Sequence, residues 1–203
     1  MQGLIQHWHE LSQRLGLIDS EPLLQELLQR YQEPRRVFHR LSHLQQVIEP
    51  LVTVEAPDWV QLAAWYHDAV YGPGRPWNER RSAALARRHL TAAGLAKEMT
   101  DRISGAILAT ASHRTEDPDI QLLLDADLSV LGCLPQEYAV YSQRLQREYS
   151  VLPVALYRRG RQEFLRRMLS RVQIFHHPWF HHQFEAQARE NLSTELDQLG
   201  AMG

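Results

Sequence analysis

The sequence predicts an all-α protein, and three observations support this. Leu, Ala, Gln, Glu and Arg, which favour helices, are abundant, whereas Val and Ile are sparse. Apolar residues recur three and four positions apart, which is the period of a helix rather than of a strand. The 203 residues contain no repeat, low-complexity tract or flexible linker. We therefore expect one compact multi-helix bundle over residues 1–203.

Caps and helix breakers bound the expected elements. Asp19 or Ser20 can cap the second helix, Pro50 helps to end the third, and glycines after Tyr71 stop the fourth. Asn78 is the expected cap of the fifth helix. The expected ranges are 4–15, about 22–31, about 37–48, 58–70, 78–93, 97–111 and about 120–128, then helices beginning at 135 and 153, the latter reaching about 171, and a last one over 178–199.

Net charge and cysteine content restrict the class of function. The formal charge of −2 at pH 7 disfavours a protein that depends on binding duplex nucleic acid or an anionic membrane. The only cysteine, Cys133, excludes an internal disulfide and a cysteine-built metal site, and is typical of a reducing compartment. No charge-free apolar run approaches the roughly 18 residues of a spanning helix. Since residues 1–15 also lack the pattern of a secretory signal, we expect a cytoplasmic protein.

Histidines and acids fall at conspicuous places along these helices. Two histidines four residues apart share a face of the expected third helix, and a His-Asp pair ends the apolar fourth. Two aspartates interrupt an apolar run, where an unpaired carboxylate would be costly to bury. The residues are His39, His43, His67, Asp68, Asp125 and Asp127. Such a set suits a divalent ion (Mn, Mg, Fe, Co, Ni or Zn) and leaves positions open for water or substrate.

The order of His, then His-Asp, then a distant Asp resembles the HD-domain superfamily of metal-dependent phosphohydrolases. The chain is most similar to a bacterial family of predicted phosphohydrolases whose substrate is unknown. The matching segments are 38–43, 63–71, 78–83 and 122–132, inside a core of about 35–132, and the tail over 149–192 is also similar. The resemblance implies an HD-type helical bundle with a metal site at its centre and helical additions at both ends.

The resemblance also implies roles for individual residues. Metal ligands are expected at His43, His67, Asp68 and Asp127, with Asp68 counted among the catalytic groups as well. Asp127 is favoured over Asp125 because Ala-Asp-Leu matches the usual context of this ligand in related enzymes. The segment at His39 is similar to the His-Asn-x-x-His motif of cyclic-nucleotide phosphodiesterases, in which the first histidine is the general acid. Arg replaces the Asn here.

Other residues are candidates for supporting roles, and each also has a purely structural interpretation. Glu79 is a candidate base, although an acid in the first turn of a helix is stabilised there in any case. His113 and Asp125 are candidates for bracing a ligand or holding a second ion. Arg161 and Arg147 are candidates for contacting a phosphate. The histidines over 176–182 are interpreted as a surface turn, and the four expected ligands could instead form a buried polar cluster.

The function expected from these features is hydrolysis of a phosphate ester or anhydride by metal-activated water. The substrate would be a small phosphorylated molecule, and nucleotides are among the candidates. One alternative is a non-catalytic HD module that binds a nucleotide or a protein partner. Another is a di-iron oxygenase of the same superfamily, in which His39 and His113 would supply additional ligands.

Overall fold

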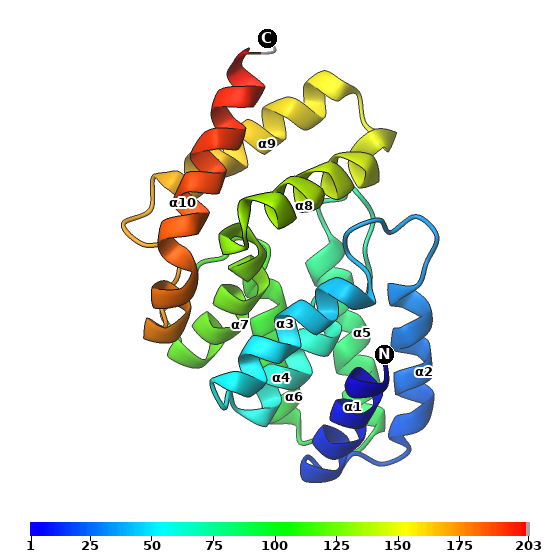
Figure 1. The fold of residues 1–203 in the computed structure, drawn as a ribbon. Helices are drawn as coiled ribbons and strands as arrows, with labels where there is room; N and C mark the ends of the chain where they lie inside the picture. Colours follow the sequence, from blue (N-terminus) through cyan, green and yellow to red (C-terminus); the bar gives the residue numbers. More distant parts are fainter. Residues whose placement is uncertain (202–203) are drawn as a thin grey trace.

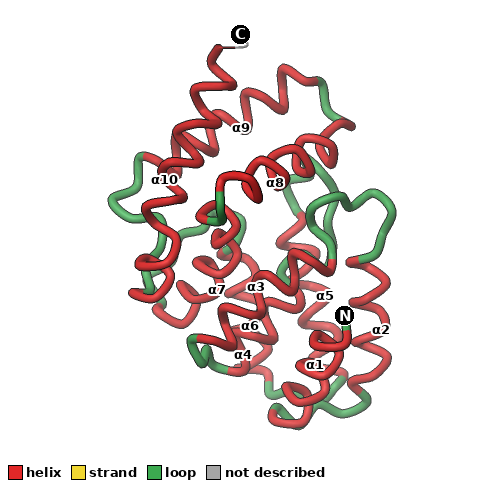
Figure 2. Tube along the Cα trace, in the orientation of Figure 1, coloured by secondary structure: helices red, strands yellow, loops and turns green. Residues whose placement is uncertain are grey.

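A computed structural model describes residues 1–201, and every regular element in that part of the chain is a helix, which confirms the all-α prediction (Figure 2). No helix within this range is both long and apolar enough to cross a membrane. The elements are α1 (Gln2–Arg14), α2 (Ser20–Tyr31), α3 (Leu41–Thr53), α4 (Asp58–Tyr66), α5 (Asn78–Ala92), α6 (Lys97–Ala109), α7 (Pro118–Leu128), α8 (Pro135–Glu148), α9 (Val154–Leu169) and α10 (Pro178–Ala201), with short 3₁₀ helices η1 (Ser129–Gly132) and η2 (Tyr149–Val151).

Helix α4 lies at the centre of the molecule because nearly all of its surface is apolar. Its residues from Trp59 to Tyr66 are all buried, and a helix that is hydrophobic on every side requires neighbours all round. Helices α3, α5, α6 and α7 pack against it, and α1 closes another side through an edge-to-face contact between Trp8 and Trp65. The residues that follow α4 are therefore delivered to the interior.

Figure 1 shows the helices in two groups along the long axis of the molecule. Helices α1 and α2 lie at one end beside the central helices, whereas α8, α9 and α10 lie at the other end. Helix α10 packs against α9 and η1, and one hydrophobic core, from Leu4 to Leu192, runs through both groups. The C-terminal helices thus cover the carboxyl-terminal side of α4.

The third helix begins later than the sequence predicts and does not end near Pro50. Residues 37–40 are not helical, because the Glu148 carboxylate accepts hydrogen bonds from the backbone N–H groups of Val37, Phe38 and His39. At the other end, Pro50 lies inside α3. A proline in the last turn of a helix forfeits one hydrogen bond without stopping the residues that follow it. The prediction that His39 and His43 share one helix is therefore wrong.

The fourth helix ends at Tyr66, four residues earlier than expected. The chain then turns, and Ser82 holds it to α5 by bonding both the N–H and the carbonyl of Val70. Asn78 was expected to cap α5, but Trp77 holds that position. The Asn78 side chain instead accepts a hydrogen bond from the N–H of Gly72 at 3.1 Å and donates one to its carbonyl at 3.0 Å. These bonds fix the loop that follows His67 and Asp68.

Candidate metal centre

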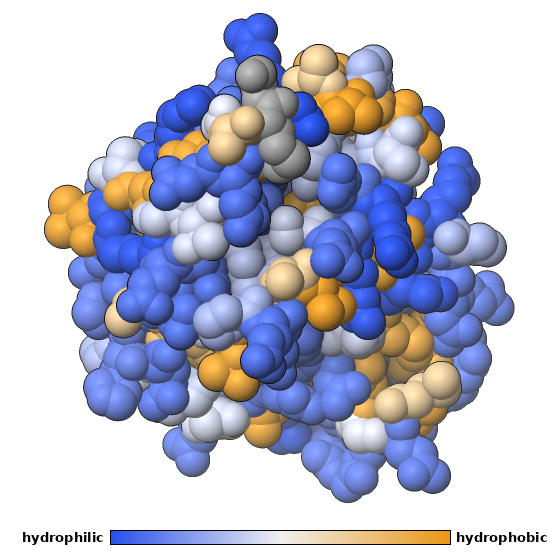
Figure 3. Space-filling view, turned by 45° about the horizontal axis from the view of Figure 1, so that its top comes forward, coloured by the Kyte–Doolittle hydropathy of each residue, from blue (hydrophilic) through white to orange (hydrophobic). Residues whose placement is uncertain are grey.

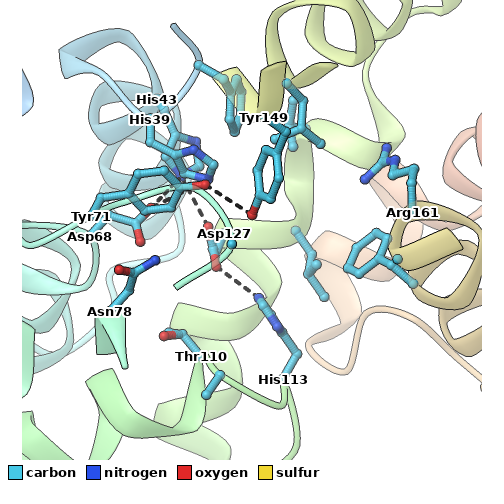
Figure 4. A pocket seen from close by; sticks show the side chains of 18 of the residues that line it. His39, His43, Asp68, Tyr71, Asn78, Thr110, His113, Asp127, Tyr149 and Arg161 are labelled. Carbon is cyan, nitrogen blue, oxygen red and sulfur yellow. Dashed lines mark hydrogen bonds and ion pairs between the residues drawn. The ribbon is translucent and has the colours of Figure 1, made fainter. Parts of the chain in front are cut away.

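The fold brings together two histidines and two aspartates from three separate segments. His43 comes from the first turn of α3, His67 and Asp68 follow α4, and Asp127 lies near the end of α7. His43, His67 and Asp68 form a group that could hold a metal ion, since one ligand atom from each lies within 4.8 Å of the others. Asp127 stands beside them, as Figure 4 shows.

The spacing of the polar atoms fits a single ion. Nε2 of His43 lies 3.2 Å from Oδ1 of Asp127 and 3.7 Å from Oδ2 of Asp68. Nε2 of His67 lies 3.5 Å and 3.2 Å from the same two oxygens. Ligand atoms that each lie about 2.1 Å from one ion stand about 3.0 Å apart at right angles and about 3.4 Å apart at tetrahedral angles. His43, His67 and Asp68 therefore fit the spacing of divalent-ion ligands, and Asp127 lies at ligand-like distances from both histidines.

The ring of His67 is oriented by the backbone. Its Nδ1 donates a hydrogen bond to the carbonyl of Ala64 at 2.7 Å, which directs Nε2 toward the cluster as the atom available to a metal. That Nε2 atom is buried without a hydrogen-bond partner, as are both ring nitrogens of His43. Buried polar atoms are rarely left unpaired. A cation between the two Nε2 atoms would satisfy them.

Electrostatics at the cluster favours positive charge. Burial opposes ionisation of Asp127, but the hydrogen bond with His113 and the nearby imidazoles of His43 and His67 outweigh it and hold the pKa of Asp127 well below its usual range. Burial likewise disfavours charge on His67, yet the adjacent Asp68 carboxylate and Asp127 raise the pKa of His67 well above normal. Burial dominates at His43 and lowers the pKa of that imidazole. Two ionised carboxylates thus face a neutral His43 and favour positive charge at His67, where a metal ion would take the place of the proton on Nε2.

His113 and Asp125 have different surroundings. Nε2 of His113 lies 2.9 Å from Oδ2 of Asp127, the oxygen not directed at His43 and His67, so His113 braces that carboxylate. Asp125 is buried elsewhere and accepts hydrogen bonds at 2.8 Å and 2.7 Å from the backbone N–H groups of His176 and His177. The structure therefore places Asp127, and not Asp125, at the cluster.

His39 lies at the edge of the cluster and is held by a residue that the sequence did not single out. Its Nδ1 is hydrogen-bonded to Oε1 of Glu148, at the end of α8, and its Nε2 lies 3.9 Å from Oδ2 of Asp68. The ring stacks on Tyr71 with centroids 4.0 Å apart. Burial raises the pKa of Glu148, but the bonds from His39, Phe38 and Val37 prevail and lower it to about 2. An ionised Glu148 thus makes Nδ1 the donor and directs Nε2 toward the cluster.

Arg36 is a second residue that sequence analysis missed. Its guanidinium is buried and donates hydrogen bonds to three backbone carbonyls, those of His39 at 3.1 Å, Asp68 at 2.7 Å and Ala69 at 3.0 Å. It therefore ties the segment before α3 to the turn after α4. No sequence signal marks this role, because Arg36 is one of many arginines and its partners are main-chain atoms.

A cavity of about 550 Å³ opens onto the cluster. His39, His43, Asp68, Asp127 and His113 lie on its wall, and Glu79 lies there too, in the first turn of α5 as expected. Within residues 1–201, Glu79 has no hydrogen bond or ion pair with the four cluster residues. Figure 4 shows Arg161 across the cavity from His39 and Asp68.

The two arginines expected at a phosphate have different environments. Arg161 is buried, and its Nε and Nη2 donate hydrogen bonds to Glu195 at 2.9 Å and 2.8 Å. Nη2 also donates to the hydroxyl of Tyr138, and Nη1 donates to that of Tyr141. Its hydrogen-bonding capacity is therefore largely used by the protein. Arg147 is exposed on α8 and does not line the cavity. The structure brings neither guanidinium to the cluster.

Comparisons with family models, curated proteins and solved structures find no match to this chain. The arrangement of the site therefore carries the functional argument.

Proposed function

We propose that the protein is a metal-dependent phosphohydrolase of HD type that cleaves a phosphate ester or anhydride. The observation that carries the proposal is the cluster of His43, His67, Asp68 and Asp127, with unpartnered imidazole nitrogens facing two ionised carboxylates at the wall of a cavity. A divalent ion held there lowers the pKa of a coordinated water and polarises a phosphoryl oxygen. Imidazole and carboxylate ligands are the set found at such hydrolytic centres.

The residues around the cluster have complementary tasks in this proposal. His113 holds one oxygen of Asp127 at 2.9 Å, so the other is directed at His43 and His67. Arg36 fixes the backbone at Asp68 and at His39 from a buried position. Together these contacts hold the ligands in position before a substrate arrives, which reduces the reorganisation that binding would otherwise require.

His39 is the residue best placed to move a proton. Its Nε2 faces the cluster, whereas its Nδ1 is occupied by Glu148. A histidine oriented by a carboxylate in this way can protonate the leaving oxygen of an ester. Glu79 remains a second candidate, since it lines the same cavity and is half-buried.

The experiment is a direct assay of phosphate release. Purified protein is loaded with Mn²⁺, Mg²⁺, Fe²⁺, Co²⁺, Ni²⁺ or Zn²⁺ in turn and offered phosphate monoesters, pyrophosphates and nucleotides. The proposal predicts metal-dependent release from at least one compound and its loss in His67→Ala. Tight binding of an unconverted compound with no release for any metal would contradict the proposal and favour the non-catalytic binding module.

A further inference from the structure

Gly160 on α9 marks an unused space beside the candidate metal centre. Glycine is the least favourable helix residue after proline, and Gly160 lies in the middle of this 16-residue helix. It lines the cavity, yet a Cβ atom placed on it would have no other atom within 4 Å. Close packing of another helix therefore does not explain the glycine. Gly160 is exposed, so the space above it opens to the cavity and to solvent.

The wall around Gly160 is apolar. We define the apolar wing of the cavity as the part lined by Tyr149, Leu152, Tyr157, Gly160 and Phe164. The rings of Tyr149 and Tyr157 lie 5.8 Å apart at 44° to each other. Tyr157, Gly160 and Phe164 are three and four residues apart, so they share one face of α9. This face is a surface for a flat hydrophobic group.

Arginine side chains lie at the edge of the apolar wing. Arg161, which lies on the same wall, is neutralised by Glu195. Two other arginines line the cavity, Arg75 and Arg167, and both are exposed to solvent. Within residues 1–201, neither of these two has an acidic partner. The guanidinium carbons of Arg161 and Arg167 lie 5.1 Å and 5.6 Å from the centroid of the Phe164 ring, so these cations meet an aromatic face at the edge of the wing.

The mouth of the cavity is hydrophobic as well. Leu156 lines the cavity and is 55% exposed, and the neighbouring Val151 and Val154 are 71% and 59% exposed. Figure 3 shows hydrophobic side chains gathered at the upper right, the side on which the start of α9 lies in Figure 1. Exposed apolar residues at a cavity entrance are typical of sites that admit apolar ligands.

We propose that the apolar wing binds the aromatic group of a phosphate monoester whose phosphate occupies the candidate metal centre. The position of the phosphate rests on the proposed function, whereas the aromatic group is assigned from the wing itself. The cavity volume of about 550 Å³ is sufficient for such a compound. Nucleobases fit less well, because their edges carry several hydrogen-bonding groups and the wing offers them only the hydroxyls of Tyr149 and Tyr157.

The test compares two non-hydrolysable probes by titration calorimetry on the Mn²⁺-loaded protein. We expect (1-naphthyl)methylphosphonate to bind at least about tenfold more tightly than methylphosphonate, because the ring buries apolar surface. Gly160→Leu fills the wing with a good helix former and should abolish that difference. Gly105→Leu is the matched control, since Gly105 is also a helical glycine with nothing within 4 Å of a Cβ but does not line the cavity. It should keep the difference.

Several results would overturn the assignment. They are equal affinity for the two probes, binding of neither probe, an unchanged preference in Gly160→Leu, and tighter binding of adenosine monophosphate than of the naphthyl probe. The outcome is separable from that of the proposed function. Preference for the naphthyl probe without any phosphate release would support the wing assignment and reject the hydrolase. Phosphate release without a preference for the naphthyl probe would support the hydrolase and reject the wing assignment.

Discussion

Glu148, at the end of α8, binds both the ring and the backbone N–H of His39, which lies 109 residues earlier in the chain. One carboxylate oxygen accepts a hydrogen bond from Nδ1 of the imidazole, and the other accepts the N–H groups of Val37, Phe38 and His39. The side chain of Glu148 is fully buried. Its charge thus determines both the path of the chain before α3 and the direction of the His39 ring.

Glu148 should make stability depend on acid pH. Its folded pKa, about 2, lies below the value of 4.5 for an unperturbed Glu, so its contribution is fully present above pH 4.5 and is lost as pH falls toward 2. The contribution amounts to at most about 3 kcal/mol. We expect the difference in free energy of unfolding between wild type and Glu148→Gln, from denaturant titrations, to be large at pH 6 and to shrink at pH 3. Glu163→Gln, at an exposed pair with Arg159, is the control. A difference that does not vary with pH would contradict this assignment.

Loss of His39 should slow hydrolysis most for esters that have poor leaving groups. If His39 protonates the departing oxygen, His39→Ala should lower kcat for alkyl phosphates by about 10² or more, and much less for p-nitrophenyl phosphate, whose leaving group needs no proton. Steady-state kinetics on both esters measures the ratio. An equal decrease for the two esters would assign His39 a structural role only.

The variants Asp127→Ala and Asp125→Ala should differ in the amount of metal that they bind. Asp127→Ala removes an oxygen beside His43 and His67, so elemental analysis should find the bound metal lost. Asp125→Ala removes the acceptor of two backbone N–H groups, which should lower the free energy of unfolding by about 1–3 kcal/mol. The metal should stay bound in that variant. Metal loss in Asp125→Ala with retention in Asp127→Ala would reverse the assignment.

Arg161 and Glu195 should behave as a buried structural pair. Their side chains are 5% and 8% exposed, and Arg161→Met leaves a buried carboxylate without its partner. We expect this variant to lose about 3–5 kcal/mol in free energy of unfolding, and Arg161→Met combined with Glu195→Leu to recover much of it. Denaturant titration measures both. A single variant as stable as wild type would show that the pair contributes nothing.

The helical class and the members of the cluster follow from local features of the sequence. The apolar segment that precedes His67 and Asp68, and the Ala-Asp-Leu context of Asp127, are signals contained within a few residues of the sequence. The roles of Glu148 and Arg36 depend on contacts made far along the chain, with backbone atoms that no side-chain pattern reveals. The same contacts explain why residues 37–40 are not helical. Arg161 is predicted to contact a phosphate because it lies in a segment similar to the family's tail. Its pairing with Glu195 is not visible in the sequence, since the two residues are 34 positions apart.

The most direct test of the central claim is removal and return of the metal. Protein stripped with a chelator should release no phosphate from 1-naphthyl phosphate, and adding one divalent ion should restore release with saturation at one ion per chain. His67→Ala should not be restored, whereas His181→Ala, at an exposed histidine of α10, should respond as wild type does. Undiminished phosphate release by the stripped protein, or full restoration of His67→Ala, would contradict a metal-dependent hydrolytic centre at this cluster.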